Sequence, residues 1–210
     1  MPIATASPAH ATTRRPTAIR RQEIVLAVLA LATEQGVDAI TTQTIADRMG
    51  LTQGAVFRHF PTKEAIWSAV LDWLSIQIEG VFASAADKPP LDALQCVFEA
   101  YMKLFARHPA VPRLFFSDTF HHPYPALHER MQTMVRRCEA RLARWIRAAQ
   151  RDGTIATGNA TAAAKFLLVT VQGLAFQSCV LGTVTNPVAA GRRIFPLYLA
   201  ALGAPSACRP

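Results

Sequence analysis

The chain has 210 residues, of which 51% are hydrophobic and 17% are charged. This apolar fraction excludes a disordered protein, and ordinary numbers of Gly and Pro, 10 and 14, exclude collagen-like and linker-like chains. The formal net charge of +8 suggests an anionic partner, either nucleic acid or a membrane surface, without choosing between them.

The cysteines and the apolar runs indicate the cellular compartment of the protein. Four cysteines lie far apart, without a C-x-x-C pair, so neither a disulfide framework nor a zinc finger is expected. The apolar run 24–32 after Arg20-Arg21 resembles a secretory signal, but Glu23 interrupts the transition from the basic pair to the apolar run, and the run is short. The stretch 166–181 contains two glutamines and is too short to span a bilayer. We therefore expect a cytoplasmic protein with no membrane partner.

In chain order, residues 1–18 read as a flexible basic arm that is rich in Pro and carries Arg14 and Arg15. Beyond it, apolar residues recur at helical spacing, and period-2 alternation of β-branched residues is absent, which predicts an all-α fold. Caps and Gly or Pro breaks place about nine helices, at 19–35, 42–49, 52–60, 62–83, 91–107, 110–120, 126–151, 159–181 and 187–202.

The second and third predicted helices are short and are joined through Gly50. Ile45 and Ala46 on the first and Val56 and Phe60 on the second are spaced to share one core. The outer face of the second helix then carries short polar side chains that suit a DNA major groove, and both helix N-termini can bind phosphate. The spacing alone predicts either a DNA-binding helix-turn-helix or an ordinary corner between two helices.

A dense, ordered motif runs through this segment: Thr42-x-x-Ile45-Ala46-x-x-x-Gly50-Leu51-Thr52-x-Gly54-x-Val56-Phe57-x-His59-Phe60-x-x-Lys63-Glu64-x-Ile66. With it, residues 24–67 resemble the DNA-binding domain of the tetracycline-repressor (TetR/AcrR) family of bacterial regulators. The rest of the chain is similar to that family only in its helical architecture.

The resemblance implies contacts with a double-stranded DNA operator. Thr42 and His59 would bind phosphate at the ends of the two helices, and Lys63 would bind phosphate or respond to a hinge motion. Gly54 would let the backbone approach the DNA closely. The family often has Tyr at positions 57 and 58, so Phe57 loses a phosphate contact and Arg58 gains a possible guanine contact. The implied DNA-binding residues are Thr42, Thr52, Gln53, Gly54, Ala55, Phe57, Arg58, His59 and Lys63.

The resemblance also implies a division of the chain and a homodimer. The helix-turn-helix domain would cover 19–65, an effector-binding and dimerisation domain 66–203, and a tail 204–210. Helices 159–181 and 187–202 would pair with those of a second copy in a four-helix bundle. Small and apolar residues suit this contact, namely Gly173, Ala175, Ile194, Leu197 and Tyr198.

Aromatic and methionine residues are concentrated between residues 98 and 176. They fit either a packed core or, as the family implies, a cavity for a small hydrophobic or aromatic effector. The candidate effector-binding residues are Phe98, Tyr101, Met102, Phe116, Phe120, Met134, Cys138, Gln172 and Phe176.

Two further features remain open. His121, His122 and His128 lie near acidic residues around a Pro-rich loop, but they lack metal-ligand spacing, so we expect a solvated loop and no metal. Arginines recur every seven residues from Arg130 to Arg151. This stripe is either a solvated helix face or a contact for an anionic ligand or a membrane surface.

Together these features predict a homodimeric transcriptional regulator, most consistent with a repressor that a small effector releases from a palindromic operator. A DNA-binding factor of the same fold without an effector is the alternative. No nucleophile–base pair or phosphate loop is visible, so neither an enzyme nor a cofactor is expected. A basic protein bound to a membrane surface is a further rival. The net charge does not decide between a DNA-binding protein and a membrane-surface protein, because residues 23–64 carry five acidic and only three basic groups.

Overall fold

The computed structural model describes residues 16–120, 122–156, 158–181 and 186–204. Residues 1–15 of the predicted arm, His121 and residues 205–210 of the predicted tail lie outside these ranges. The arm was predicted to extend to residue 18, but α1 already begins at Thr17. In the described ranges the chain is helical without strands, which confirms the all-α prediction. The elements are α1 (Thr17–Gln35), α2 (Thr42–Met49), α3 (Gln53–His59), α4 (Lys63–Ala83), α5 (Pro90–Arg107), α6 (Ala110–Leu114), the 3₁₀ turn η1 (Asp118–Phe120), α7 (Pro125–Arg151), α8 (Ala160–Leu181) and α9 (Pro187–Ala201).

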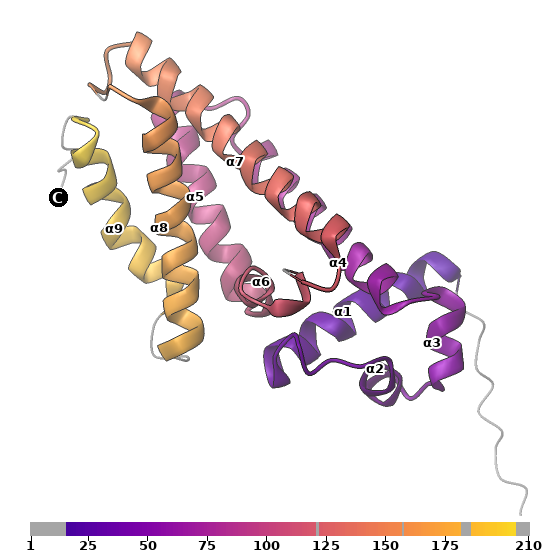
Figure 1. Cartoon of the computed structure of the whole chain (residues 1–210). Coiled ribbons are helices and arrows are strands. Elements are labelled where there is room, and N and C mark those ends of the chain that lie inside the picture. The colour runs from indigo at the N-terminus through magenta and orange to yellow at the C-terminus, as the bar shows by residue number, and fades with distance from the viewer. Residues whose placement is uncertain (1–15, 121, 157, 182–185, 205–210) are drawn as a thin grey trace, which may run out of the picture.

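Helices α1, α2 and α3 form a small N-terminal bundle (Figure 1). The apolar run of α1 supplies its centre, with Ile24 and Val28 fully buried. Ile45 and Ala46 of α2 and Val56 of α3 are also buried, as their spacing predicts. Because these short helices bury their apolar faces in one core, their polar faces remain at the surface.

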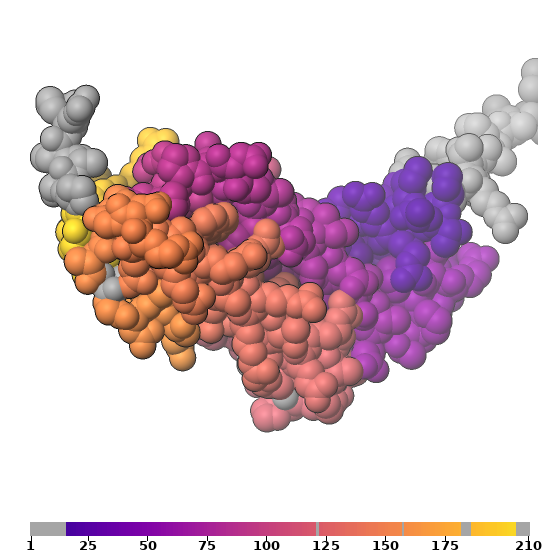
Figure 2. Space-filling model, turned by 90° about the horizontal axis from the view of Figure 1, so that it is seen from above, coloured from indigo at the N-terminus to yellow at the C-terminus, as the bar shows by residue number. Residues whose placement is uncertain are grey.

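Helix α4 connects this bundle to the rest of the chain. It packs against α1 at its beginning and against α5 and α7 farther along. Trp67 is fully buried, and its ring meets Phe120 of η1 edge-on with the ring centroids 5.3 Å apart. Figure 2 shows the result as two adjacent lobes, the N-terminal bundle in indigo and purple and a larger lobe that ends in orange and yellow. Any shift of α4 therefore affects both lobes.

The larger lobe is built from α5, α7, α8 and α9, with α7 and α8 sharing the most extensive contact. Helix α9 packs closely on α5, because Gly191 faces the side chains of Phe98 and Met102. A Cβ at Gly191 would lie 2.8 Å from Phe98 and 3.0 Å from Met102. The hydroxyl of the buried Tyr198 donates to the carbonyl of Ala163, which ties α9 to α8.

Hydrogen bonds between distant segments join the two lobes beside α6. The guanidinium of Arg113 donates to the carbonyl oxygens of Ala32 and Thr33 at the end of α1, at 3.5 and 3.1 Å. The backbone N–H and hydroxyl of Thr119 both donate to the carboxylate of Asp38, at 3.0 and 2.7 Å. These bonds fix the N-terminal bundle against α6 and η1.

The predicted helix over 110–120 is wrong in its length. The chain forms α6 over only five residues, then a turn and the 3₁₀ segment η1. The reason lies outside the segment, because the bonds from Thr119 to Asp38 turn the chain away from a helical path.

By length and mean hydropathy alone, α4 and α8 could each cross a membrane. Such helices also occur in the cores of proteins that never enter one, so this test is weak. In the most apolar window of α8 only 33% of residues are buried within this chain, against 44% for α4. Helix α8 therefore leaves much of its apolar surface uncovered.

Candidate nucleic-acid interface and effector site

The turn between α2 and α3 depends on Gly50. Its backbone is left-handed, with φ 63° and ψ 35°, a conformation that side chains with a Cβ rarely adopt. The N–H of Leu51 donates to the carbonyl of Ala46 at 2.9 Å, which closes the end of α2. The short turn brings the N-terminus of α3 close to the N-terminus of α2.

Two threonines cap these helices. Thr41 forms a capping box with Thr44, in which each side chain accepts from the other residue's backbone N–H. The hydroxyl of Thr52 accepts from the N–H of Ala55 at 3.2 Å. Because Thr41 is the cap of α2, the side chain of Thr42 is available for other contacts.

Thr42 and Gln53 are joined across the turn. The side-chain amide of Gln53 donates to the hydroxyl oxygen of Thr42 at 2.7 Å. The Thr42 hydroxyl still has its own proton to donate, which is the contact that a phosphate oxygen would accept. The bond also fixes the first side chain of α3 against the start of α2.

The outward face of α3 carries most of the predicted DNA-binding residues. Gln53, Gly54, Phe57 and Arg58 are exposed, and Ala55 is partly buried. In the described part of the chain, no atom beyond the adjacent residues and the backbone of α3 lies within 4 Å of the position that a Cβ at Gly54 would take, so the fold does not require glycine there. This face therefore combines a bare stretch of backbone with a guanidinium, a combination that suits close approach and base contact.

Arg21 of α1 holds the C-terminal end of α3. Its guanidinium donates to the carbonyl of His59 at 2.8 Å and lies 4.2 Å from the centre of the Phe60 ring. Arg21 thus has a structural role in holding α1 to α3. Partial burial, followed by the nearby charges of Arg20 and Arg58, lowers the pKa of His59, so its ring is neutral at pH 7.

Lys63 is the first residue of α4, directly after the cap Thr62, whose hydroxyl accepts from the N–H of Ala65 at 3.0 Å. It is only partly exposed. Its place at the start of the connecting helix agrees with either of the two roles that the resemblance implies.

The nine candidate effector residues do not form one site. Tyr101, Met134, Cys138 and Gln172 line a common cavity between α5, α7 and α8. Phe98 and Met102 pack against α9, and Phe120 packs on Trp67. The last two, Phe116 and Phe176, are both exposed, and their ring centroids lie 5.1 Å apart.

The inner cavity itself is small and uncharged. Its free volume is about 20 Å³, roughly the space for one water molecule. The hydroxyl of Tyr101 donates to the sulfur of Cys138 at 3.3 Å, and burial raises the pKa of both groups. Both therefore stay protonated at neutral pH, and an effector here would have to displace side chains.

A larger opening, of about 530 Å³, lies between α4 and α7. We call it the α4–α7 groove; its walls are Leu71, Ser75, Ile78, Glu79, Ala126, Glu129, Arg130, Thr133, Met134, Arg137, Cys138 and Arg141. Ile78, Met134 and Cys138 also line the inner cavity, so the two spaces share walls. Two of the predicted effector residues, Met134 and Cys138, line this groove, whereas its arginines Arg130, Arg137 and Arg141 are not among them.

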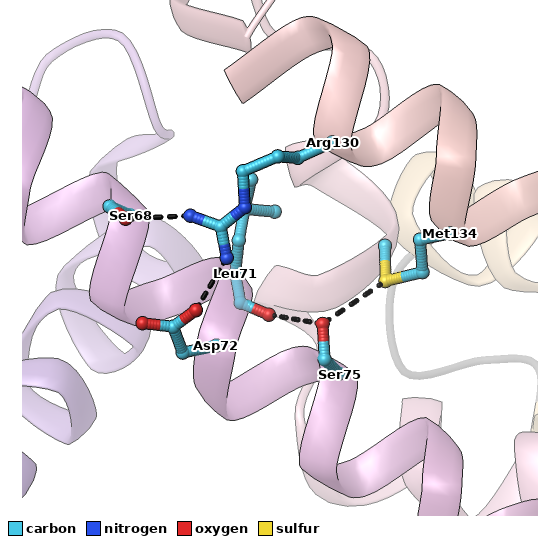
Figure 3. Close-up of polar contacts among 6 residues, drawn as sticks. All are labelled: Ser68, Leu71, Asp72, Ser75, Arg130 and Met134. Atoms are coloured by element: carbon cyan, nitrogen blue, oxygen red, sulfur yellow. Dashed lines mark hydrogen bonds and ion pairs between the residues drawn. The ribbon is translucent and has the colours of Figure 1, made fainter. Parts of the chain in front are cut away.

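A polar clasp holds α4 to α7 at one end of this groove (Figure 3). The guanidinium of Arg130 donates to the hydroxyl of Ser68 at 2.6 Å and to the carboxylate of Asp72. Farther along, Ser75 donates to the carbonyl of Leu71, and its hydroxyl lies 3.9 Å from the sulfur of Met134. Arg141 similarly pairs with Glu79 at 2.7 Å. The arginine-rich face is thus partly used for joining two helices.

Helix α8 presents an apolar stripe to the surface. Its large exposed residues recur at intervals of three and four, at Phe166, Val169, Phe176 and Val180, with Gly173 between them. Ala175 and Tyr198, which sequence reasoning assigned to a dimer contact, are buried inside this chain instead. Leu197 of α9 is exposed as predicted.

The histidine-rich loop offers no metal site in the part that the structure describes, where no group of three or more His, Cys, Asp or Glu side chains converges. His122 is exposed, and the ring of His128 contacts the amide of Gln132 at 2.7 Å. His121 lies outside the described residues.

Comparison with known proteins agrees with this geometry. Residues 24–70 match the family described as bacterial regulatory proteins, tetR family. The chain is 35% identical over 101 residues to an HTH-type transcriptional repressor of Mycobacterium tuberculosis, covering 46% of this chain and 52% of the relative. It is 25% identical over 135 residues to the nucleoid occlusion factor SlmA of Vibrio cholerae, covering 61% of this chain and 68% of SlmA.

Solved structures show the same fold over most of the chain. A TetR transcription regulator from Haloarcula marismortui superposes with a TM-score of 0.75 at 20% identity, covering 88% of this chain and 98% of that one. The regulator FadR from Bacillus subtilis, in complex with stearoyl-CoA, gives a TM-score of 0.73 at 16% identity, and the match covers 85% of this chain and 97% of FadR. With the family match across the helix-turn-helix, these findings show that the chain belongs to the tetR family of bacterial regulatory proteins and is a transcriptional regulator with a DNA-binding helix-turn-helix.

Proposed function

We propose that this protein acts in the bacterial cytoplasm as a homodimeric repressor that a small molecule releases from a palindromic operator. The observation that carries the proposal is the continuity of α3 and α4. The recognition helix ends at His59, and α4 begins at Lys63 and then forms one wall of the 530 Å³ groove. Any ligand that moves α4 would also move the helix that contacts DNA.

The apolar stripe on α8 supports the homodimer. A row of exposed apolar side chains at intervals of three and four, interrupted by Gly173, suits close packing against a second helix. A two-fold dimer would set two recognition helices about one turn of DNA, roughly 34–36 Å, apart. One α3 of seven residues reads few bases, so pairing is also what sequence specificity needs.

The alternative is a DNA-binding factor of this fold that responds to no small molecule. The nearly filled inner cavity of about 20 Å³ favours it, because an ordinary ligand pocket is more than ten times larger. The relationship to a nucleoid occlusion factor is in keeping with this alternative. The open groove between α4 and α7 favours the ligand-released repressor.

A gel shift with DNA from beside the protein's own gene tests the proposal. We expect a discrete complex that survives excess unrelated competitor DNA. A second gel, run with extracts of small molecules from the host bacterium, separates the two candidates: loss of the complex supports a ligand-released repressor. A specific complex that no extract disturbs supports the factor without an effector, and absence of a specific complex contradicts both.

A further inference from the structure

The α4–α7 groove is lined by both polar and apolar residues. Its polar lining includes Arg130, Thr133, Arg137 and Arg141, all from α7. Leu71, Ile78 and Met134 form its apolar part. Since Met134 also faces the inner cavity, the flexible side chain of this residue stands between the groove and a deeper apolar space.

The three arginines differ in what they already contact. Arg130 is held by Asp72 and Ser68, and Arg141 pairs with Glu79 while lying 4.1 Å from the centre of the Phe82 ring. Arg137 is exposed, and among the described residues no carboxylate pairs with it. Its guanidinium therefore keeps all its donors for a ligand.

The carboxylates around the groove limit where an anion could bind. Glu79 is occupied by Arg141, and Glu129 also lines the groove, one helical turn before Thr133. Thr133 lies three residues after Arg130 and four before Arg137, so both long arginine side chains can reach the space above its hydroxyl. A guanidinium pair with a hydroxyl between them is a donor set that matches a carboxylate or phosphate.

From these observations we propose that the α4–α7 groove binds an amphipathic anion, a molecule with an apolar chain and a carboxylate or phosphate head. The head lies against Thr133 between Arg137 and Arg130, and the chain lies along Leu71, Ile78 and Met134. The head competes with Asp72 for Arg130 and so loosens the clasp between α4 and α7. The proposal rests on the proposed function, because it names the class of molecule that acts on the repressor.

Calorimetric titration of the protein without DNA tests the site by itself. The probes are decanoate, decyl phosphate and, as a neutral analogue, decanol, each below its aggregation limit. We expect saturable binding of one or both anions and at least about tenfold weaker binding of decanol, because the analogue lacks the charge-assisted hydrogen bonds. Preference for decanoate or for decyl phosphate distinguishes a carboxylate from a phosphate head.

Three variants locate the head group. Arg137→Gln should weaken binding of the anion about tenfold, whereas Arg144→Gln, an exposed arginine of α7 that does not line the groove, should leave it unchanged. Asp72→Asn should strengthen binding severalfold, because the anion no longer competes for Arg130. Equal effects of Arg137→Gln and Arg144→Gln, or equal binding of decanoate and decanol, would overturn the proposal.

Failure of the site and failure of the proposed function have different signatures. If no anion binds but the gel shift with promoter DNA succeeds, the proposed amphipathic ligand is wrong and the DNA-binding function stands. If the anions bind as expected and no specific DNA complex forms, the groove is a real site in a protein whose proposed function is wrong.

Discussion

Gly54 lies in the first turn of α3 with an ordinary helical backbone and open space around its Cα. Nothing among the described residues explains a glycine there, since an alanine would fit and would favour the helix. A partner whose surface comes close to the backbone would explain it. The residue is thus a direct probe of whether α3 meets DNA.

The Gly54→Ala variant should keep or slightly raise the free energy of unfolding, by up to about 1 kcal/mol. It should weaken operator binding on the order of tenfold, about 1.4 kcal/mol, because the added methyl group separates the backbone from the DNA. Urea unfolding and gel-shift titration measure the two effects. Gly80→Ala, at an exposed and equally open position of α4, is the matched control, and equal DNA affinity for both variants would contradict the predicted contact.

His59 gives the interface a dependence on pH. Partial burial and the charges of Arg20, Arg58 and Arg21 lower the pKa of the free protein's ring below 6.5. A phosphate beside the ring would offset those charges and raise the pKa in the complex. Binding would then take up a proton. Operator affinity should therefore rise as the pH falls from the raised pKa of the complex to the lowered pKa of the free protein.

Anisotropy titrations at about pH 7.5 and about pH 5.5 would show this rise for the wild-type protein. His59→Gln, which keeps a polar side chain and cannot titrate, should flatten the dependence. A pH profile that is the same for both proteins would show that His59 does not approach a phosphate in the complex.

At the scale of whole elements, the caps and stops in the sequence predict the helices well. Thr52, Gly36 and the Asn186-Pro187 pair act on the residues next to them, so their effect is visible without a structure. The helix predicted over 110–120 is too long, because Thr119 in this segment is hydrogen-bonded to Asp38, some eighty residues away. Local patterns contain no information about such a partner.

The candidate sites also differ in how far local sequence predicts them. The positions of α2 and α3 residues follow from a dense local motif, so most of the predicted DNA-binding residues do lie on one outward face. All of the candidate effector residues except Gln172 are aromatic or sulfur-containing, and this property does not say which of them face the same space. Phe98 and Met102 pack against Gly191, a close contact that only the three-dimensional arrangement reveals.

Gly191 should therefore matter for the packing of α9 on α5. The Gly191→Ala variant would place a methyl group 2.8 Å from Phe98, and we expect a loss of about 1–3 kcal/mol in the free energy of unfolding. Gly80→Ala, at an exposed and open position of α4 outside the α8 stripe, should not lower stability. Thermal unfolding compares the stability of the two variants. Equal stability of the Gly191→Ala variant and the control would show that α5 and α9 adjust freely to the extra methyl group.

At the scale of the whole molecule, the uncovered stripe on α8 predicts self-association. A charge at Val180, which is 64% exposed, should leave the fold intact and split the dimer, because burying the carboxylate without a partner is unfavourable. We expect Val180→Glu to sediment as a folded monomer at micromolar concentration. Ile76→Glu adds the same charge at a 67% exposed position of α4, outside the stripe, and should remain dimeric. If the Val180→Glu protein is also dimeric, α8 is not the contact.

The central claim is that two copies of this chain together recognise one DNA sequence. The most direct measurement is an anisotropy titration of a labelled promoter duplex, and of a scrambled duplex of equal length, over a series of salt concentrations. The account predicts saturation at two protomers per duplex, affinity that falls steadily with salt, and binding to the scrambled duplex weaker by about a thousandfold or more. Equal affinity for the two duplexes, or no saturable binding to either, would contradict it.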